Sequence, residues 1–252
     1  MKLSNKISWI TAGFIVLCTL IVMIKMRVEA NKYLKELKIG NKTWVEENIP
    51  LTEFTIIEAG KHFVVNWHKG SPKATVRVEE NLKQYVKVEQ DGQRIRVKMD
   101  SLTNYRVNES IRIDLYSDSL TEIFMNGFVE FNMKDSLRVQ QLKVNIENHA
   151  DASLWIIANQ VNMQLNDFCE VNLKGSTDYL KLKMDDHSSL SAKNFEVNKC
   201  DLEMGDFSEA RVNVKIHLNA ECTDHSNLTY SENPQLETHL INREFSEIQP
   251  AK

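Results

Sequence analysis

The chain has few of the residues that stabilise small domains through cross-links or metal ions. Its 252 residues include 4 Cys, 8 Gly and 4 Pro, few for a chain rich in turns. Cys18 lies in an apolar run, and Cys169, Cys200 and Cys222 are an odd number without Cys-x-x-Cys spacing. The sequence therefore indicates neither a disulfide framework nor a zinc site. Cys200 and Cys222 are expected at inward positions, where cysteine packs as a small apolar side chain.

The body of the chain also lacks the positive charge of a nucleic-acid-binding protein. Residues 1–38 carry a charge of +5, which leaves −9 for the remainder of a chain whose net charge is −4. An acidic body repels phosphate backbones, so we expect no nucleic acid partner. A Gly-x-Ser-x-Gly nucleophile elbow is absent as well.

Residues 7–24, ISWITAGFIVLCTLIVMI, contain no charged residue. A helix of this length is just able to cross the hydrocarbon core of a bilayer. A cleavable signal peptide is the alternative, since residues 28–30 have suitable small side chains, but Lys25 and Arg27 lie between them and the apolar run. We predict an uncleaved signal anchor over residues 1–26, contacting the membrane through 7–24.

The short basic first segment favours a cytoplasmic N-terminus and an exported body. Residues 27–50 begin with good helix formers, and we predict a helical stalk and linker there. No amphipathic helix is indicated beyond it.

From Phe54 onwards, apolar residues recur with a period of two, which is typical of strands. Phe54 and Ile56 are in phase, and Asp91-Gly92 predicts the turn of a hairpin. Two further runs alternate in the same way, and their inward residues are Phe63, Val65, Trp67, Ala74, Val76 and Val78.

An internal repeat follows from about residue 120. Apolar residues stand three and five positions before and after one aromatic position, which recurs at spacings of 21, 19, 19, 20 and 18 residues. A coil of stacked strands explains this pattern, because a single repeat cannot bury its own apolar face. We predict an all-β, parallel β-helix-like domain with rungs of about 20 residues. Its corners are placed at Phe128, His149, Phe168, His187, Phe207 and His225.

The corner strings "DHSSL" and "DHSNL" raise the question of a Ser-His-Asp triad. Neighbouring side chains of an extended chain point to opposite faces, so Asp186, His187 and Ser188 are not expected to converge. The corner histidines occupy alternate rungs, roughly 9–10 Å apart, which is too far for two of them to share a zinc ion. We interpret the corner rings as flat side chains packed at turns, with the preceding Asp as a turn residue.

Other candidate sites are weaker. The outward-facing charges are mixed and typical of a solvated face. A cation could be attracted if four corner carboxylates aligned, namely Asp185, Asp186, Asp206 and Asp224. Trp67, Trp155 and Tyr179 could stack on sugars, but core or edge positions are the ordinary interpretation. We assign no catalytic, cofactor-binding or metal-binding residue.

The sequence resembles the auto-transporter adhesin head (GIN) domain family of bacterial envelope proteins. The resemblance covers about residues 51–240 and rests on "FTIIEAGKHFVVNW", "VKVEQDGQRIRVKM" and repeats such as "LNDFCEVNLKG" and "MGDFSEARVNV". Family members usually have Gly-Ser at the corners, whereas this chain has Asp-Phe or Asp-His, with Gly127 as a remnant. The resemblance implies a right-handed β-helix-like head in the cell envelope, without catalytic residues to transfer.

These observations predict a non-enzymatic, single-pass protein of the bacterial inner membrane. Its exported head, residues 51–240, is expected to bind an envelope protein or surface polysaccharide, and residues 241–252 are expected to form a tail. A polysaccharide-processing enzyme on the same scaffold is the alternative and would require carboxylates clustered in a groove. A membrane-anchored sensor is less favoured, because residues 1–6 have no room for a signalling domain.

Overall fold

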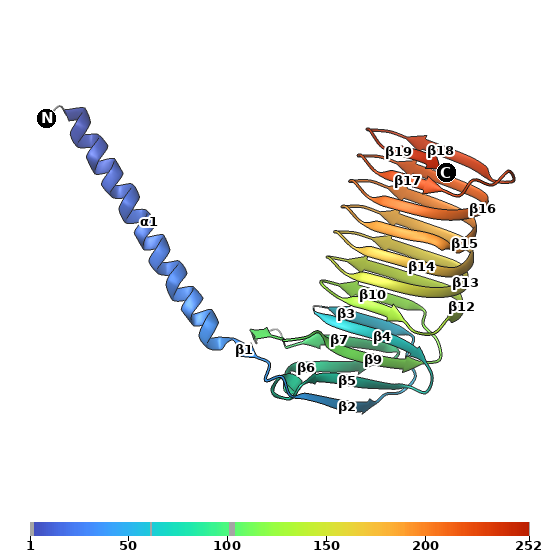
Figure 1. The fold of residues 1–252 in the computed structure, drawn as a ribbon, viewed down its shortest axis with the longest axis horizontal. Helices are drawn as coiled ribbons and strands as arrows, with labels where there is room; N and C mark the ends of the chain where they lie inside the picture. Colours follow the sequence, from blue (N-terminus) through green and yellow to red (C-terminus); the bar gives the residue numbers. More distant parts are fainter. Residues whose placement is uncertain (1–2, 61, 101–103, 252) are drawn as a thin grey trace.

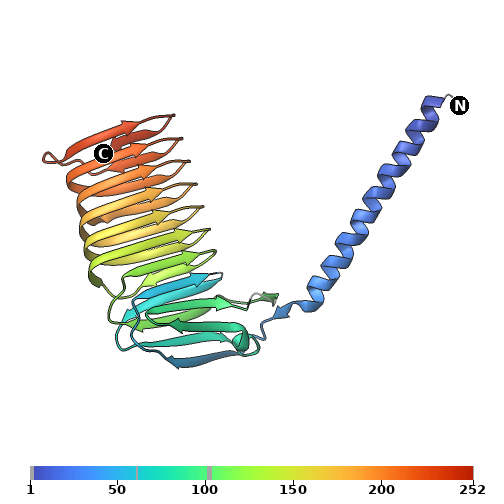
Figure 2. The same cartoon turned by 180° about the vertical axis from the view of Figure 1, so that it is seen from behind.

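The computed structural model describes residues 3–60, 62–100 and 104–251. It contains one long N-terminal helix and a β-solenoid of about 6 turns, and 61% of its residues lie in strands. Figures 1 and 2 show the rungs stacked along one axis, with their tight turns aligned on one edge. The predicted parallel β-helix-like repeat domain preceded by an apolar helix is confirmed.

The helix α1 (Leu3–Glu36) extends away from the solenoid (Figure 1). Its segment Ile10–Lys32 has a mean hydropathy of 1.9, and none of this segment is buried. By length and composition it could cross a membrane. The helix continues into the predicted stalk as far as Glu36. The strands β1 (Lys38–Ile39) and β2 (Trp44–Pro50) then occupy much of the remaining linker.

The repeat region forms parallel rungs in register. Asp151 pairs with Glu170, and Leu165 pairs with Met184, so one whole rung matches the next. Further along, bulges at residues 172–174 and 192–199 absorb changes in repeat length. The strands are β10 (Glu122–Asn126), β11 (Glu130–Met133), β12 (Leu137–Glu147), β13 (Asp151–Leu165), β14 (Glu170–Met184), β15 (Ser189–Met204), β16 (Glu209–Cys222), β17 (Asn227–Tyr230), β18 (Glu237–Asn242) and β19 (Glu247–Pro250).

The core consists of ladders of apolar side chains, one from each rung. Residues three positions before each corner form one such ladder and are 0–3% exposed, namely Met125, Ile146, Leu165, Met184, Met204 and Cys222. Each buried methylene adds about 0.8 kcal/mol of hydrophobic stabilisation. Because adjacent rungs share this buried surface, no rung is stable alone. The predicted inward positions of Cys200 and Cys222 are confirmed.

The base of the solenoid, residues 38–117, combines parallel and antiparallel strands. The rung formed by β3 (Ile56–Gly60) and β4 (Phe63–Lys69) pairs on one side with β10 and β11 and on the other with β7 (Arg94–Met99) and β9 (Ile111–Ser117). Antiparallel pairs β2–β5, β5–β9 and β6–β7 complete the region. Its remaining elements are β5 (Lys73–Glu79), the 3-10 helix η1 (Glu80–Tyr85), β6 (Val86–Asp91), β7 (Arg94–Met99), β8 (Tyr105–Arg106) and β9 (Ile111–Ser117).

Three sequence expectations concern this base. The hairpin turn at Asp91-Gly92 is confirmed, with Asp91 opposite Arg94 and Gly92 at a φ of 56°. The predicted phase of Phe54 with Ile56 is wrong. Phe54 and Ile57 are buried and Ile56 is half-exposed, because β3 begins only at Ile56 and the alternation does not extend back to Phe54. The other predicted inward residues of β4 and β5 are buried.

A buried carboxylate joins the segment after α1 to the base. Glu79 is 1% exposed. It accepts hydrogen bonds from the Lys42 N–H (2.7 Å), the Asn108 N–H (3.1 Å) and Asn108 Nδ2 (2.7 Å). Burial by itself raises the pKa of Glu79, but these hydrogen bonds outweigh burial and hold the pKa below its ordinary value. Because β1 also pairs with β8, the chain leaving the helix is fixed to the head.

The solenoid strands continue beyond residue 240, where the sequence analysis placed the end of the head. β18 pairs with β16, and β19 pairs with β17, so residues 237–250 add a further rung. The final strands are therefore located in the segment for which a tail was expected. Their apolar residues, such as Leu240 and Ile248, pack against the core but remain partly exposed.

Candidate functional site

From Phe128 to Phe245, the corner of each rung is a tight turn with two successive residues in the left-handed region. Asp167 and Phe168, for example, have φ angles of 58° and 59°. The corner at Phe207 is closed by a hydrogen bond of 3.0 Å from the Ser208 N–H to the Gly205 C=O. Two positive φ angles and such a hydrogen bond are typical of a type I′ turn, in which Asn and Asp are favoured at the first central position. An aromatic residue at the second position is unusual, because glycine fits there without strain.

Adjacent corners are also joined by backbone hydrogen bonds. The Phe168 N–H donates to the Asp186 C=O (2.8 Å), and the His187 N–H donates to the Asp206 C=O (2.8 Å). The strand ladder therefore continues through the turns and holds successive corners in line. Each ring consequently lies directly above the ring of the rung below.

The corner rings form one continuous stack, here called the aromatic ladder. Neighbouring ring centroids are 4.7–5.4 Å apart, and the ring planes diverge by no more than 24°. The six predicted corner residues are brought together in it, and histidine alternates strictly with phenylalanine. The ladder runs through His62, Phe128, His149, Phe168, His187, Phe207, His225 and Phe245.

Sequence reasoning missed the two ends of the ladder. Phe245 follows Glu244 and precedes Ser246, the same acidic–aromatic–serine order as at Phe207, so the signal was present. His62 is different, because its rung lies next to that of Phe128 although residues 70–120 separate the two in the chain. A search for a constant spacing does not find it.

The ladder is a surface feature rather than part of the core. Phe128, Phe168 and Phe207 are 55–59% exposed, and Phe245 is 88% exposed. A residue in the left-handed region costs about 1–2 kcal/mol when it is not glycine. A stacked aromatic pair returns about 0.5–1.5 kcal/mol. Because these terms roughly cancel, fold stability alone does not account for a ring at every corner.

Carboxylates flank the ladder on both sides. The first acidic row stands directly before the rings and comprises Asp167, Asp186, Asp206, Asp224 and Glu244. The second acidic row stands two residues after the rings, where paired strands bring the same position of each rung into register. Its carboxylates are Glu130, Asp151, Glu170, Glu209 and Glu247, and Ser189 and Asn227 occupy the two positions between the last three. Among the described residues, the two rows contain no Lys or Arg.

The carboxylates raise one another's pKa. A hydrogen bond with Asp224 and the charge of that residue raise the pKa of Glu244. Burial, together with the charges of Glu170 and Glu130, raises the pKa of Asp151 despite a hydrogen bond from a backbone N–H. Like charges in proximity disfavour ionisation in this way. The flanks of the ladder therefore carry concentrated negative charge.

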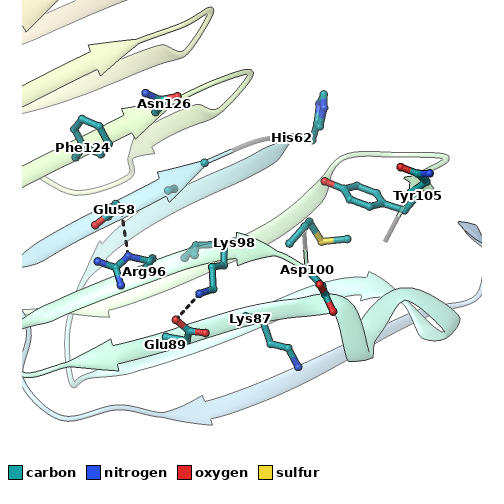
Figure 3. Close-up of a pocket in the computed structure, with 15 residues that line it drawn as sticks. Glu58, His62, Lys87, Glu89, Arg96, Lys98, Asp100, Tyr105, Phe124 and Asn126 are labelled. Carbon is teal, nitrogen blue, oxygen red and sulfur yellow. Dashed lines mark hydrogen bonds and ion pairs between the residues drawn. The ribbon is translucent and has the colours of Figure 1, made fainter. Parts of the chain in front are cut away.

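A groove of about 920 Å³ lies at the base end of the ladder, close to His62. Figure 3 shows strands β3, β6, β7 and β10 contributing to its wall, with Phe124 and Tyr105 above charged side chains. The ion pairs Arg96–Glu58 (3.1 Å) and Lys98–Glu89 (2.8 Å) neutralise much of the charge. A groove of this size is large enough for a small ligand, but its polar groups already bind one another.

The sequence of the head matches a known family. The family model described as "Putative auto-transporter adhesin, head GIN domain" matches residues 53–234. The chain belongs to this family. No curated protein matches the sequence significantly.

Solved structures from Bacteroides and Parabacteroides species have the same fold as this GIN head. A putative adhesin from Bacteroides fragilis has a TM-score of 0.79 at 15% identity, over 84% of this chain and 99% of that one. A putative lipid binding protein from Parabacteroides distasonis has a TM-score of 0.69 at 15% identity, over 86% and 100%. A putative adhesin from Parabacteroides merdae has a TM-score of 0.62 at 16% identity, over 86% and 99%. At these identities the similarity establishes the fold alone.

The geometry of the GIN head argues against a triad at the corners. His187 is exposed on the ladder, whereas Ser188 is 1% exposed and faces the interior. A nucleophilic cysteine is equally disfavoured, since burial raises the pKa of Cys169 and Cys200 to about 12. These residues therefore act as core side chains.

A metal centre is not formed in the described part of the GIN head, where no group of three or more His, Cys, Asp or Glu could hold an ion. The ladder explains this for histidine, because a phenylalanine separates each histidine from the next. Asp186, Asp206 and Asp224 do align along the corner, as the cation hypothesis required, but Asp185 lies beside Lys183, at 3.6 Å. The aligned carboxylates therefore form a charged surface.

The three aromatic residues considered for sugar stacking have other partners. Trp67 is fully buried and donates to Ser117 Oγ (2.9 Å). The Lys174 ammonium lies 4.0 Å from the centroid of the Trp155 ring, and Tyr179 donates to Asp201. This hydrogen bond and partial burial raise the pKa of Tyr179 to about 12. The core or edge interpretation applies to all three.

Three carboxylates of the second acidic row line a hollow of about 200 Å³. They are Glu130, Asp151 and Glu170, and Asn132 and Asn172 lie beside them. Glycoside hydrolysis uses two carboxyl groups, one of which acts as an acid with a raised pKa, and in this hollow the raised pKa belongs to Asp151. A polysaccharide-processing enzyme would require clustered carboxylates, and this hollow contains such a cluster.

Proposed function

We propose that the protein is a single-pass protein of the bacterial inner membrane whose exported GIN head is a binding module. The apolar segment, residues 7–24, anchors the protein in the membrane. The hydrogen bonds of Glu79 connect the head to the chain that leaves this helix. The exposed aromatic ladder is the observation that carries the proposal, because four exposed phenylalanine side chains in one line on the surface are typical of an interaction site. The partner is an envelope protein or surface polysaccharide, bound without turnover.

The first test concerns topology. A reporter that is active only after export is fused to the C-terminus, and the size and location of the product are determined. Activity from a full-length, membrane-bound chain is expected. A shortened soluble product would mean that the apolar segment is a cleaved leader, and a stable but inactive fusion would place the head in the cytoplasm. Either result contradicts the anchored envelope protein.

A pair of variants makes this test specific to the helix. Leu17→Arg with Leu20→Arg places two charges in the apolar segment, each costing about 2.5–3.5 kcal/mol at the centre of a membrane helix. Membrane retention and export should both be lost. Leu17→Val with Leu20→Val keeps the segment apolar and should behave as the native chain does.

The second test concerns binding. The full-length protein in detergent micelles is incubated with isolated bacterial envelope fractions, and retention and soluble sugar products are both measured. Retention without product is expected. An absence of retention under all conditions contradicts a binding module.

The carboxylate hollow favours polysaccharide hydrolysis as a second candidate function. In that case Asp151, whose pKa is raised, is the acid, and a neighbouring glutamate is the base or nucleophile. Asp151→Asn should abolish release of sugar products, and Glu209→Gln, further along the same row, should not. If the native protein releases no product from envelope polysaccharides, this candidate is rejected.

A further inference from the structure

The shape of the aromatic ladder restricts what it can bind. Each internal ring has both faces covered by its neighbours at 4.7–5.4 Å, so mainly ring edges reach solvent. Sugar recognition by aromatic residues needs open ring faces. The ladder instead offers a ridge of ring edges, in which apolar phenylalanine edges alternate with histidine edges. The aliphatic part of a long side chain can lie against the phenylalanine edges.

The charge on both flanks restricts the partner further. Each acidic row supplies five carboxylates along the ladder, and only Glu209 is bridged by a basic side chain among the described residues of these rows, by Arg211 at 3.0 Å. The pKa of Glu244 is raised by the hydrogen bond with Asp224 and by the charge of Asp224, although the charge of Arg243 lowers it. An anionic polymer, nucleic acid or second acidic ridge would be repelled.

We propose that the aromatic ladder and its two acidic rows bind an extended, lysine- and arginine-rich segment of a partner protein. Aliphatic stems of the basic side chains cover the ring edges, and their charged ends reach carboxylates on either side. This inference rests on the proposed function as a binding module and specifies the chemistry of its partner.

The dimensions fit such a segment. The eight rings are separated by seven rung spacings of about 4.8 Å, so the ridge is roughly 34 Å long. An extended chain rises about 3.3 Å per residue, so about ten residues span the ridge. Each rung from Phe128 to Phe245 offers one or two carboxylates of the acidic rows. A basic segment can therefore bind in several registers.

Pairing of two ladders from separate copies is the main alternative among protein partners. It would bring ten carboxylates of one head against ten of another, since each head carries two rows of five. Such like-charge contacts cost several kilocalories per mole when they are close. The ladder is therefore assigned to a basic partner rather than to self-association.

The test uses the full-length protein in neutral detergent micelles and a fluorescent decalysine peptide as the probe. Saturable binding is expected by fluorescence anisotropy, weakening as salt is raised because exposed charges are screened. A decaglutamate peptide should not bind. If decalysine does not bind at low salt, or decaglutamate binds equally well, the inference is overturned.

Two ladder variants and one control locate the binding surface. The first variant combines Asp167→Asn, Asp186→Asn, Asp206→Asn and Asp224→Asn, and it preserves the turn because Asn148 occupies the same position with a φ of 58°. The second combines Phe168→Gly and Phe207→Gly, which the left-handed backbone accepts without strain. The control removes four exposed carboxylates elsewhere on the head, with Glu46→Gln, Glu53→Gln, Glu203→Gln and Glu232→Gln.

Both ladder variants should weaken decalysine binding by about tenfold or more, whereas the control should change it by less than about twofold. Equal losses in the control and the first variant would show attraction by net charge alone and overturn the inference. Unchanged binding by the second variant would overturn the role of the rings. If the ladder variants no longer bind decalysine but are still retained by envelope fractions, the head is a binding module whose site lies elsewhere. If the native protein is not retained by envelope fractions, the binding module itself is rejected.

Discussion

The base and the repeat region of the head are stabilised in different ways. In the repeat region, one rung resembles the next, and each contact is made again about 20 residues later, as at Leu165 and Met184. In the base, Glu79 makes hydrogen bonds to Lys42 and Asn108 that occur once. The difference shows that repetition creates the long ridge on which binding is proposed, whereas a unique polar cluster fixes the head to the chain leading from the helix.

The largest expected effect comes from breaking one rung. Gly175 has a φ of 115°, and a Cβ there would lie 1.9 Å from the Ile156 C=O oxygen of the rung below. Gly175→Ala should therefore lower the free energy of unfolding by about 4 kcal/mol, measured by urea denaturation.

The matched control for this change lies in the base. Gly92 also has a positive φ, 56°, but a Cβ added there would meet no described atom within 4 Å. Gly92→Ala should cost only about 1 kcal/mol, from backbone strain alone. Equal losses in the two variants would mean that close stacking of rungs does not set the cost.

The next largest effect should come from the buried carboxylate of the base. Glu79→Ala removes the acceptor of three hydrogen bonds, from the Lys42 N–H, the Asn108 N–H and Asn108 Nδ2, although Asn108 Nδ2 keeps its hydrogen bond to the Gly40 C=O. A loss of about 3 kcal/mol in the free energy of unfolding is expected. Hydrogen exchange at residues 38–42 should accelerate at the same time. The exposed Glu46→Ala should change stability by less than about 0.5 kcal/mol.

A smaller effect is expected at the ladder. Phe168→Gly removes two ring contacts, of 4.8 and 5.3 Å, but also relieves the left-handed backbone. The free energy of unfolding should change by no more than about 1 kcal/mol, because the two terms oppose each other. Leu182→Ala, in the core of the same rung, should cost about 2–5 kcal/mol. A loss at Phe168 as large as at Leu182 would show that the ring is needed for stability, which contradicts its assignment to binding.

The smallest expected effect is on the pH dependence of stability, which should differ between the base and the repeat region. The pKa of Glu79 is lowered, so its contribution to stability is present above its unfolded value of 4.5 and is lost as the pH falls through the lower folded value. Burial and the charges of Asp206 and Asp186 raise the pKa of Asp185, although Lys183 lowers it. The stability that Asp185 contributes is therefore present below its unfolded pKa of 3.8 and is lost as the pH rises through its higher folded pKa.

Asp185→Asn should therefore raise the melting temperature slightly at pH 7 and leave it unchanged below the unfolded pKa of the aspartate. Glu79→Gln should lower the melting temperature at pH 7, and this difference should shrink in acid. Thermal unfolding followed by circular dichroism at several pH values checks both. A stabilising effect of Asp185→Asn that grows on acidification would contradict the direction of its pKa shift.

The sequence by itself determined the apolar helix, the period of the rungs and the six predicted corners. These features depend on residues close in the chain or on a spacing that repeats, because alternation places inward side chains and stacking requires the same pattern in every rung. The sequence also predicts that the aspartates before the rings are turn residues, because Asp tolerates the left-handed region, and these aspartates have positive φ angles.

Only the tertiary structure decided which residues from distant parts of the chain lie side by side. His62 enters the ladder beside Phe128 because β3 and β4 form a rung between strands that follow them in the chain. The alignment of two acidic rows beside exposed ring edges, and the burial of Glu79 against Asn108, likewise bring together residues that no short-range pattern connects. Such contacts depend on how rungs stack and how the base folds back, so they are set by packing in three dimensions rather than by local sequence.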